Sequence, residues 1–257
     1  MFSITANGHT YQADLLVFDK DGLMFECEQF WIEMADARLR ALRRYCSVEQ
    51  TVGYATMMGV KTEVKNGEPA TVFVEPTGIL AIAPPTEEVV IMAAYLVDKC
   101  GIVWHEARKI AAQLFEDSDA DISLDRALKP QPGYVELMKR INDLGIPYGV
   151  ATSDTVDRTR DSMARYNCWD NVRFVVTSAD VERGKPEPDM LEYISKSEKV
   201  PLDRMVMIGD SYVDVKMAYA AGSYGIGVTT SAEMQEKMKP YATEILSSLE
   251  GIRIDKA

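Results

Sequence analysis

The sequence is poor in the residues that carry most thiolate, redox and histidine chemistry. Its 257 residues include four cysteines and two histidines. No two cysteines have the C-x-x-C spacing of a zinc site or a redox dithiol. So few cysteines are typical of a protein from a reducing compartment. Catalysis built on histidine has only His9 and His105 to draw on.

Basic residues and long apolar runs are also scarce. Lys and Arg number 28 against 40 Asp and Glu, which gives a formal net charge of -12. This balance argues against nucleic acid and anionic membranes as partners, since neither would be attracted. No apolar run approaches the ~18–20 residues that span a bilayer, and the first eight residues do not resemble a signal peptide. We therefore expect a cytoplasmic protein, in which an anionic substrate would need a local positive site.

The most informative stretch that is present is V-F-D-K-D-G at residues 17–22. The apolar run Leu15–Phe18 predicts a buried strand with Asp19 at its carboxyl end, where open α/β sheets bind ligands. Two crowded carboxylates, Asp19 and Asp21, require a cation or a shared proton. Mg²⁺ would satisfy them and leave one carboxylate free to act as a nucleophile. A calcium loop is disfavoured because apolar residues follow directly.

Hydrophobic periodicity predicts the organisation of the rest of the chain. After residue 132, short apolar runs alternate with helical patterns, which indicates βαβ units and a parallel sheet. The predicted fold class is α/β, a Rossmann-like doubly wound core with a mostly helical domain inserted after its first strand. We place the core at residues 1–24 and 130–257 and the insertion at 25–129.

Outside that core, several local signals predict structure. Asn7-Gly8 between β-forming runs predicts a hairpin. Within the insertion, Ser47 and Gln50 form the pattern of a capping box at the start of a helix. Residues 60–85 fit either a second hairpin or a long loop. Residues 116–129 are acidic and predict a loop.

Each predicted core strand ends in a polar residue suited to chemistry. The second strand ends in Thr152, the third leads by a loop to Lys185, and the fourth ends in Asp210 with Asp214 one helical turn on. Because the carboxyl ends of parallel strands share one sheet edge, we expect these side chains to converge with Asp19. A carboxylate nucleophile, a second carboxylate, a hydroxyl, an ammonium and further carboxylates for magnesium together suit phosphoryl transfer.

Taken singly, each of these residues also has an ordinary structural interpretation. The D-x-D-G string can be a polar turn, Lys185 a solvated loop lysine and Asp214 a surface helix residue. Thr152 or Ser153 can cap the following helix. Asp154 and Asp189 are predicted to be helix-start residues. The joint occurrence of the set in order, each after an apolar strand, favours the catalytic interpretation.

At these motifs the chain resembles the haloacid dehalogenase superfamily. The matching features are D-x-D-G at 19–22, Thr152 after an apolar strand, Lys185 before Pro186, and G-D-x-x-x-D at 209–214. The resemblance covers nearly the whole core and the position of the insertion. A helical insertion at this point is similar to the cap of the subgroup that holds phosphoglycolate phosphatases and β-phosphoglucomutases.

The resemblance implies a role for each catalytic residue. Asp19 would attack phosphorus and carry an aspartyl-phosphate, and Asp21 would protonate the leaving alcohol and then deprotonate water. Thr152 would hydrogen-bond the phosphoryl oxygens, with Ser153 as the open alternative, and Lys185 would offset their charge. Backbone N–H groups after Asp21 could also cradle the phosphate. The residues expected to bind phosphate are Asp19, Gly22, Thr152, Ser153 and Lys185.

The same resemblance implies Mg²⁺ as the cofactor. Its ligands would be the Asp19 carboxylate, the backbone carbonyl of Asp21 and Asp210, and Asp214 would complete or support the site. Lys20 departs from the apolar residue often found between the two aspartates. On a strand its side chain would alternate away from those of Asp19 and Asp21, and it could still help to offset their charge.

The leading interpretation is a magnesium-dependent phosphatase for a small phosphorylated metabolite, acting as a monomer or homodimer. Asp21 argues against a dehalogenase, because halide needs no acid. A phosphomutase stays open, since only the cap would decide it. A phosphonate hydrolase would need a cap lysine, such as Lys61 or Lys65. The complete set of motif residues argues against a catalytically silent binding protein on the same fold. The long insertion argues against a flavodoxin-like phospho-acceptor domain. We expect the cap to close at crossings near 23–26 and 129–133.

Overall fold

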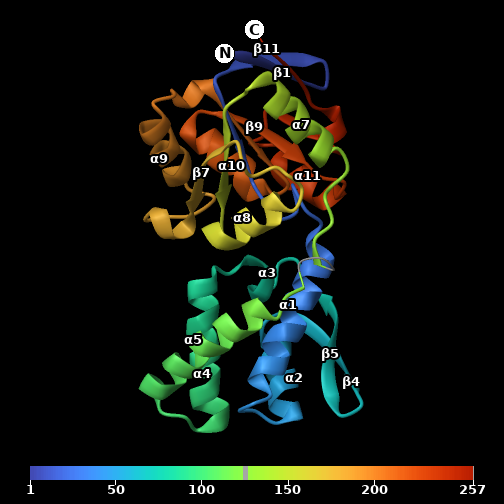
Figure 1. Ribbon diagram of the computed structural model, residues 1–257, viewed down its shortest axis with the longest axis vertical. Coiled ribbons are helices and arrows are strands. Elements are labelled where there is room, and N and C mark those ends of the chain that lie inside the picture. Colours follow the sequence, from blue (N-terminus) through green and yellow to red (C-terminus); the bar gives the residue numbers. More distant parts are fainter. Residues whose placement is uncertain (124–126, 257) are drawn as a thin grey trace. The chain divides into compact units, whose positions relative to one another are not determined.

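A six-stranded parallel sheet organises most of the chain (Figure 1). The computed structural model describes residues 1–123 and 127–256. The strand order is β10-β9-β8-β3-β6-β7, so the sheet grows in both directions from β3. This arrangement confirms the predicted α/β, Rossmann-like doubly wound fold. Its strands are β3 (Leu15–Phe18), β6 (Tyr148–Thr152), β7 (Val172–Thr177), β8 (Met205–Gly209), β9 (Tyr224–Val228) and β10 (Glu244–Leu246).

The central strands form because they are apolar on both faces. Every residue of β3, β6 and β8 is buried, as expected of parallel strands covered by helices. The helices of this part are α7 (Tyr134–Leu144), α8 (Val156–Ala164), α9 (Asp189–Glu198), α10 (Tyr212–Ala221) and α11 (Ala232–Met238). Short 3-10 helices add η1 (Ser178–Asp180), η2 (Leu202–Arg204) and η3 (Leu249–Gly251). One buried core cluster joins the sheet to α9 and α10 through residues that include Val17, Met190, Leu191, Met207 and Met217.

The register of the sheet sets where the polar strand ends lie. Phe18, the last residue of β3, pairs with Ile208 of β8 and with Val150 of β6. Asp19 follows Phe18 directly, while Asp210 and Thr152 each follow their paired residue by two positions. Three polar strand ends therefore reach the same edge of the sheet.

The two ends of the chain form a separate antiparallel sheet. Its strands, in the order β11-β1-β2, are β11 (Arg253–Lys256), β1 (Phe2–Ala6) and β2 (His9–Ala13). The predicted hairpin is confirmed, and Asn7 and Gly8 in its turn have φ of 49° and 84°. Strand β11 was not expected from its sequence, and its pairing with β1 places the last described residues beside the first (Figure 1).

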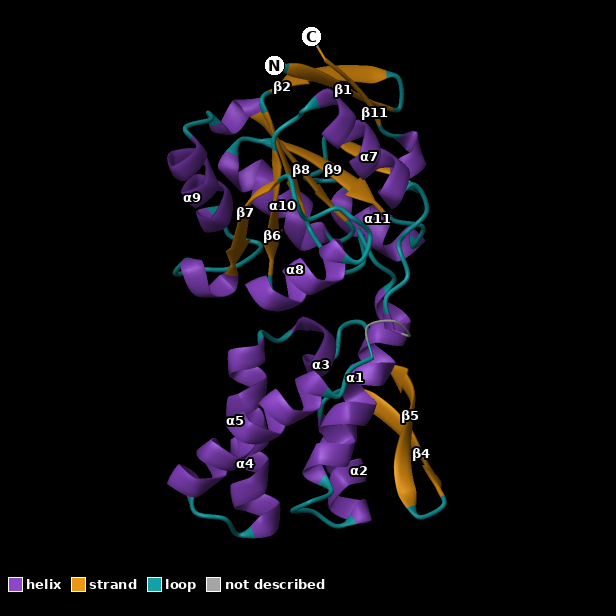
Figure 2. Cartoon of the chain, in the orientation of Figure 1, coloured by secondary structure: helices purple, strands orange, loops and turns teal. Residues whose placement is uncertain are grey.

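The chain divides into two compact units, one of Met1–Glu26 with Lys129–Ala257 and one of Cys27–Leu128. The predicted insertion began at residue 25 and ended at 129, and residues 124–126 within it lie outside the described residues. The second unit is helical apart from one hairpin in its described residues (Figure 2). Its elements are α1 (Cys27–Leu42), α2 (Val48–Met57), β4 (Val60–Lys65), β5 (Glu68–Val74), α3 (Ile79–Ile82), α4 (Pro85–Cys100) and α5 (Trp104–Ala120).

Local signals within the second unit had mixed outcomes. The capping box at Ser47 is present, with both reciprocal hydrogen bonds to Gln50. Residues 60–85 contain the hairpin rather than a long loop, and the short helix α3 follows it. The loop predicted from residue 116 was wrong for residues 116–120, where α5 continues. None of the helices in the described ranges is long and apolar enough to cross a membrane.

Candidate active site

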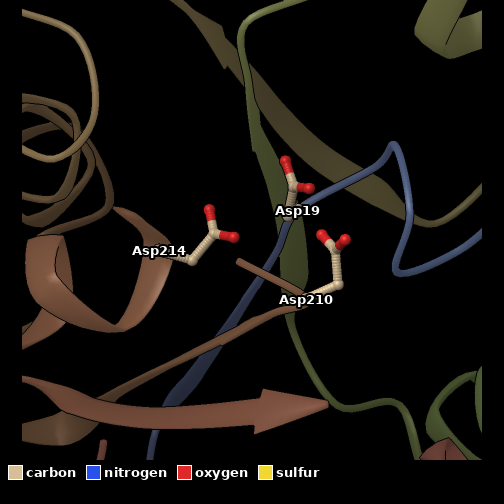
Figure 3. Close-up of side chains that lie close together, drawn as sticks. All are labelled: Asp19, Asp210 and Asp214. Atoms are coloured by element: carbon tan, nitrogen blue, oxygen red, sulfur yellow. The ribbon is translucent and has the colours of Figure 1, made fainter. Parts of the chain in front are cut away.

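Three carboxylates meet at the edge of the sheet that the register defines (Figure 3). Asp19 follows β3, Asp210 follows β8, and Asp214 lies in the first turn of α10. One carboxylate oxygen from each lies within 4.8 Å of those of the other two. Ser211, the N-cap of α10, orients Asp214, because its backbone N–H donates to Asp214 Oδ2 at 3.1 Å. We call these three aspartates, with Lys185, the acidic cluster.

Lys185 brings an ammonium group into the acidic cluster from the loop after η1. Its Nζ donates to Asp19 Oδ1 at 2.6 Å and to Asp214 Oδ1 at 2.7 Å. Burial by itself would lower the pKa of Lys185, but Asp19 and Asp214 outweigh it and the pKa is raised. Lys185 is therefore charged, and the prediction that it joins the strand-end carboxylates agrees with the geometry.

The acidic cluster is short of positive charge. Burial, together with the charges of Asp19 and Asp214, raises the pKa of Asp210 well above its ordinary value. Burial also raises the pKa of Asp19, although Lys185 opposes the shift. Across residues 1–123 and 127–256, no cationic side chain forms an ion pair with Asp210. Three carboxylates thus face one ammonium group. Their oxygen atoms are the ligands that a hard divalent cation such as Mg²⁺ prefers.

Gly22 allows this close approach of the loop after β3. Its φ is +87°, and a Cβ at this position would lie 2.1 Å from Asp210 Oδ2. Only glycine fits, because any side chain would displace the Asp210 carboxylate. The Gly22 N–H, which was expected to bind phosphate, instead donates to the carbonyl oxygen of Phe25 at 3.0 Å. In this conformation it is therefore engaged within the loop.

Lys20 pairs with one of the two aspartates whose charge it was expected to offset, but its side chain does not alternate as it would on a strand. Its side chain was expected to point away from Asp21, yet its Nζ lies 2.8 Å from Asp21 Oδ1 and the whole residue is buried. The expectation was wrong because β3 ends at Phe18, so the alternation of a strand no longer applies. Burial by itself would lower the pKa of Lys20, but Asp21 and Asp154 outweigh it and the pKa is raised. Burial raises the pKa of Asp21 to about 6, against the charge of Lys20.

Asp154 was predicted to be a helix-start residue, but it is part of a buried ion-pair group. The N-cap of α8 is Thr155, not Asp154. Asp154 Oδ2 accepts from Lys20 Nζ at 2.6 Å, and its Oδ1 lies 3.2 Å from Arg158 Nη1. Burial opposes this charge, but Lys20 and Arg158 outweigh it and lower the pKa of Asp154. We call Lys20, Asp21, Asp154 and Arg158 the paired cluster.

The sequence offered one signal for the paired cluster that our reasoning missed. The sequence T-S-D at 152–154 stands at the end of the neighbouring strand, so Asp154 was available as a counter-charge for Lys20.

The two candidates for binding phosphate at that strand end, Thr152 and Ser153, differ in exposure. Thr152 is 1% exposed and its Oγ1 accepts the backbone N–H of Asp154 at 3.0 Å, whereas Ser153 is exposed.

A small cavity opens beside the acidic cluster within the first unit. Its volume is about 260 Å³, room for several water molecules or a small polar group. Asp210 and Gly22 line it on one side, and hydroxyl groups that follow β9 and β10 contribute to the rest. Of the three aspartates of the acidic cluster, Asp210 is the one that lines this cavity, so a small ligand there would reach the Asp210 carboxylate.

Comparison with known proteins places this site among related sequences. The family model described as haloacid dehalogenase-like hydrolase matches residues 96–229, which include Thr152, Lys185, Asp210 and Asp214 but not Asp19. The bifunctional riboflavin kinase/FMN phosphatase of Arabidopsis thaliana is 30% identical over 131 residues, which cover 50% of this chain and 34% of that protein. Hexitol phosphatase A of Escherichia coli K12 is 29% identical over 154 residues, 57% of this chain and 67% of that protein.

The fold also matches solved structures along most of the chain. The crystal structure of a predicted phosphoglycolate phosphatase from Haemophilus somnus 129pt aligns with a TM-score of 0.64 at 15% identity. That alignment covers 93% of this chain and 96% of the other. By sequence, the chain spans about half the length of the curated relatives it matches first.

Proposed function

Because the chain belongs to the haloacid dehalogenase-like hydrolase family, we propose that it is a phosphatase that hydrolyses a small phosphate monoester with the help of Mg²⁺. The observation that carries the proposal is the acidic cluster, in which Asp19 pairs with the Lys185 ammonium and lies close to two further carboxylates. Several relatives are named as phosphatases of small phosphorylated compounds, which supports the class of substrate.

Phosphate chemistry suits the charges at this site. The protein carries a net charge of -12, so an anionic substrate needs a positive group where it binds. Lys185 supplies one charge, and Mg²⁺ held by Asp19, Asp210, Asp214 and the backbone carbonyl of Asp21 would supply the rest and draw in the phosphate oxygens. Phosphoryl transfer depends mainly on such positioning and charge stabilisation.

The proposed reaction has two steps carried by two aspartates. A carboxylate oxygen of Asp19 bonds to phosphorus as the ester P–O bond breaks, and the leaving oxygen takes a proton from Asp21. In the second step water bonds to phosphorus and gives a proton to Asp21. The bond between phosphorus and Asp19 breaks with return of its electron pair to the carboxylate. The products are the alcohol and inorganic phosphate.

We assign phosphate binding to Thr152 and Lys185. Because Thr152 Oγ1 already accepts an N–H of the chain, its hydroxyl proton is available to donate to a phosphate oxygen. Ser153 is exposed and the Gly22 N–H is engaged, so neither is required in this assignment. We assign substrate selection to the second unit, as a cap. The proposed substrate is a small phosphorylated metabolite of the cytoplasm. The protein is proposed to act as a monomer or homodimer.

The test is release of inorganic phosphate from a panel of esters, with and without Mg²⁺. The panel contains 4-nitrophenyl phosphate, 2-phosphoglycolate, glycerol phosphate, a hexitol phosphate and FMN. Wild type is compared with Asp19→Asn and with a matched control, Asp143→Asn, at an exposed helix position. We expect Mg²⁺-dependent activity in wild type and control, and none in Asp19→Asn.

The alternatives give different results in the same assay. Equal activity in Asp19→Asn and wild type would reject Asp19 as the nucleophile. If no ester is hydrolysed, the phosphatase proposal fails, and conversion of one hexose phosphate into another would then indicate a mutase. If a chelator leaves the activity unchanged, the proposal that hydrolysis requires Mg²⁺ is wrong.

A further inference from the structure

The paired cluster contains a lysine whose position is not explained by packing. Lys20 separates the two aspartates of the D-x-D-G motif and none of its surface is exposed. An apolar side chain would fill the same buried volume without the cost of burying an ammonium group. A buried charge that is retained next to reactive groups therefore calls for a role of its own.

The contacts of Lys20 join two strand ends. Its Nζ lies 2.8 Å from Asp21 Oδ1, in the loop after β3, and 2.6 Å from Asp154 Oδ2, in the turn after β6. Lys185 holds Asp19 in the same way, with its Nζ 2.6 Å from Asp19 Oδ1. Two different lysines thus hold the two neighbouring aspartates, each by one oxygen.

Asp154 is fixed independently of Lys20. Its Oδ1 accepts the backbone N–H of Thr155 at 2.7 Å and lies 3.2 Å from Arg158 Nη1. Its own backbone N–H donates to Thr152 Oγ1 at 3.0 Å. The carboxylate is therefore anchored to the start of α8, and it can orient Lys20 without depending on it.

We propose that Lys20 and Asp154 are positioning residues that hold the Asp21 carboxylate in place for proton transfer to and from the substrate. The inference rests on the proposed phosphatase function. Lys20 contacts Oδ1 of Asp21, and we assign the proton of the reaction to the other oxygen. The protein then keeps the same Asp21 geometry when Asp21 gives a proton to the leaving oxygen and when it takes one from water. Neither Lys20 nor Asp154 touches the substrate in this assignment.

The role predicts a dependence on the leaving group that a purely structural role would not produce. An alkoxide leaves phosphorus poorly unless it is protonated, whereas 4-nitrophenolate leaves without an acid. Loss of the Lys20 or Asp154 contact should therefore reduce kcat/KM for an alkyl ester more than for 4-nitrophenyl phosphate. Because both values come from one preparation, their ratio does not depend on the fraction of protein that is folded.

The variants are Lys20→Met and Asp154→Asn, with Asp157→Asn as the matched control on the exposed side of α8. Each is assayed with 4-nitrophenyl phosphate and with the best alkyl ester of the panel. We expect the alkyl ester to lose on the order of 10²-fold more than the aryl ester in both variants, in line with general acid catalysis. We expect the control to change neither. Lys20→Arg, which keeps the charge, should recover part of the alkyl ester activity.

Two results would overturn the inference, and they are distinguishable. Equal losses on both esters in Lys20→Met and Asp154→Asn would show that the paired cluster only stabilises the fold. Hydrolysis of neither ester by wild type would reject the proposed function, and the inference with it. If Lys20→Met does not fold, the same ratio measured for Asp154→Asn and Lys20→Arg decides the question.

Discussion

The acidic cluster and the paired cluster both contain residues of the D-x-D-G motif, yet they differ in charge balance. In the acidic cluster Asp19 and Asp214 share the ammonium of Lys185, and Asp210 has no ion-pair partner among the described residues. In the paired cluster two carboxylates meet the cationic groups of Lys20 and Arg158. The first is electrostatically incomplete and suits binding of an external cation and an anionic substrate. The second is complete and suits holding a side chain still.

The largest effect should follow from removing the one ammonium of the acidic cluster. In Lys185→Met, Asp19 and Asp214 lose their only ion-pair partner among the described residues, so the phosphate would meet uncompensated negative charge. We expect kcat/KM to fall about 10²–10³-fold, as for loss of one transition-state donor. Without metal, we expect the free energy of unfolding to fall by about 3–5 kcal/mol. Urea unfolding and steady-state kinetics measure the two effects.

The matched control for this variant is Lys139→Met. Lys139 also pairs with an aspartate, Asp143, but both side chains are largely exposed. We expect its stability and activity to match wild type, because exposed ion pairs contribute little. Similar losses in both lysine variants would contradict the special position of Lys185.

A double-mutant cycle should show that the paired cluster acts as one unit. Lys20→Met and Asp154→Asn should each lower the free energy of unfolding by about 1–3 kcal/mol, because each removes one buried, charged hydrogen bond while Arg158 still pairs with Asp154 and Asp21 still pairs with Lys20. The double variant should lose less than the sum, with a coupling of at least about 1 kcal/mol. Urea unfolding of the four proteins gives the coupling. The exposed pair Lys237 and Glu233 is the control and should show no measurable coupling. Additive losses for Lys20→Met and Asp154→Asn would contradict the view that these residues act as one unit.

Removing a carboxylate from the acidic cluster should raise the free energy of unfolding, whereas the variants above lower it. Without metal, Asp210→Asn should raise the free energy of unfolding by roughly 1 kcal/mol, since it removes one of three crowded carboxylates whose burial and mutual repulsion raise the pKa of Asp210. Wild type should gain about 2.7 kcal/mol from Mg²⁺ at a hundredfold excess over its Kd, and the variant much less. Thermal unfolding with Mg²⁺ and with chelator tests both. An equal response of the two proteins to Mg²⁺ would remove Asp210 from the metal site.

The smallest effect concerns Glu244, a carboxylate of neither cluster. Burial opposes its charge, but hydrogen bonds from Tyr11, Asn7 and His9 outweigh it and lower the pKa of Glu244. A lowered pKa means that the stabilisation is present above the ordinary value near 4.5 and is lost as the pH falls through the folded-state pKa. Glu244→Gln should remove about 1 kcal/mol at neutral pH and less below pH 4.

Urea unfolding of wild type and Glu244→Gln between pH 7 and pH 3 measures this contribution. The difference between the two proteins should narrow as the pH falls. A difference that widens toward acid would mean that the folded-state pKa is raised instead, as for Asp210 in the acidic cluster.

The strand ends could be predicted because their signal is local. The apolar runs before Asp19, Thr152 and Asp210 indicate buried strands, and a parallel sheet brings such ends to one edge. The extent of α5 could not be predicted in the same way. Its acidic last turn reads as a loop, but Ser118 is buried and accepts from Arg38 of α1, so a distant helix stabilises it.

By itself the sequence determined the fold class, the order of the motifs and the surplus of carboxylates at one sheet edge, because periodicity and residue type act over a few neighbouring positions. Only the tertiary structure decided how these charges are shared. One partner of Lys20 is Asp154, 134 residues away, and one partner of Lys185 is Asp19, 166 residues away. An ion pair depends on distance in space and on burial, and neither can be read from spacing along the chain.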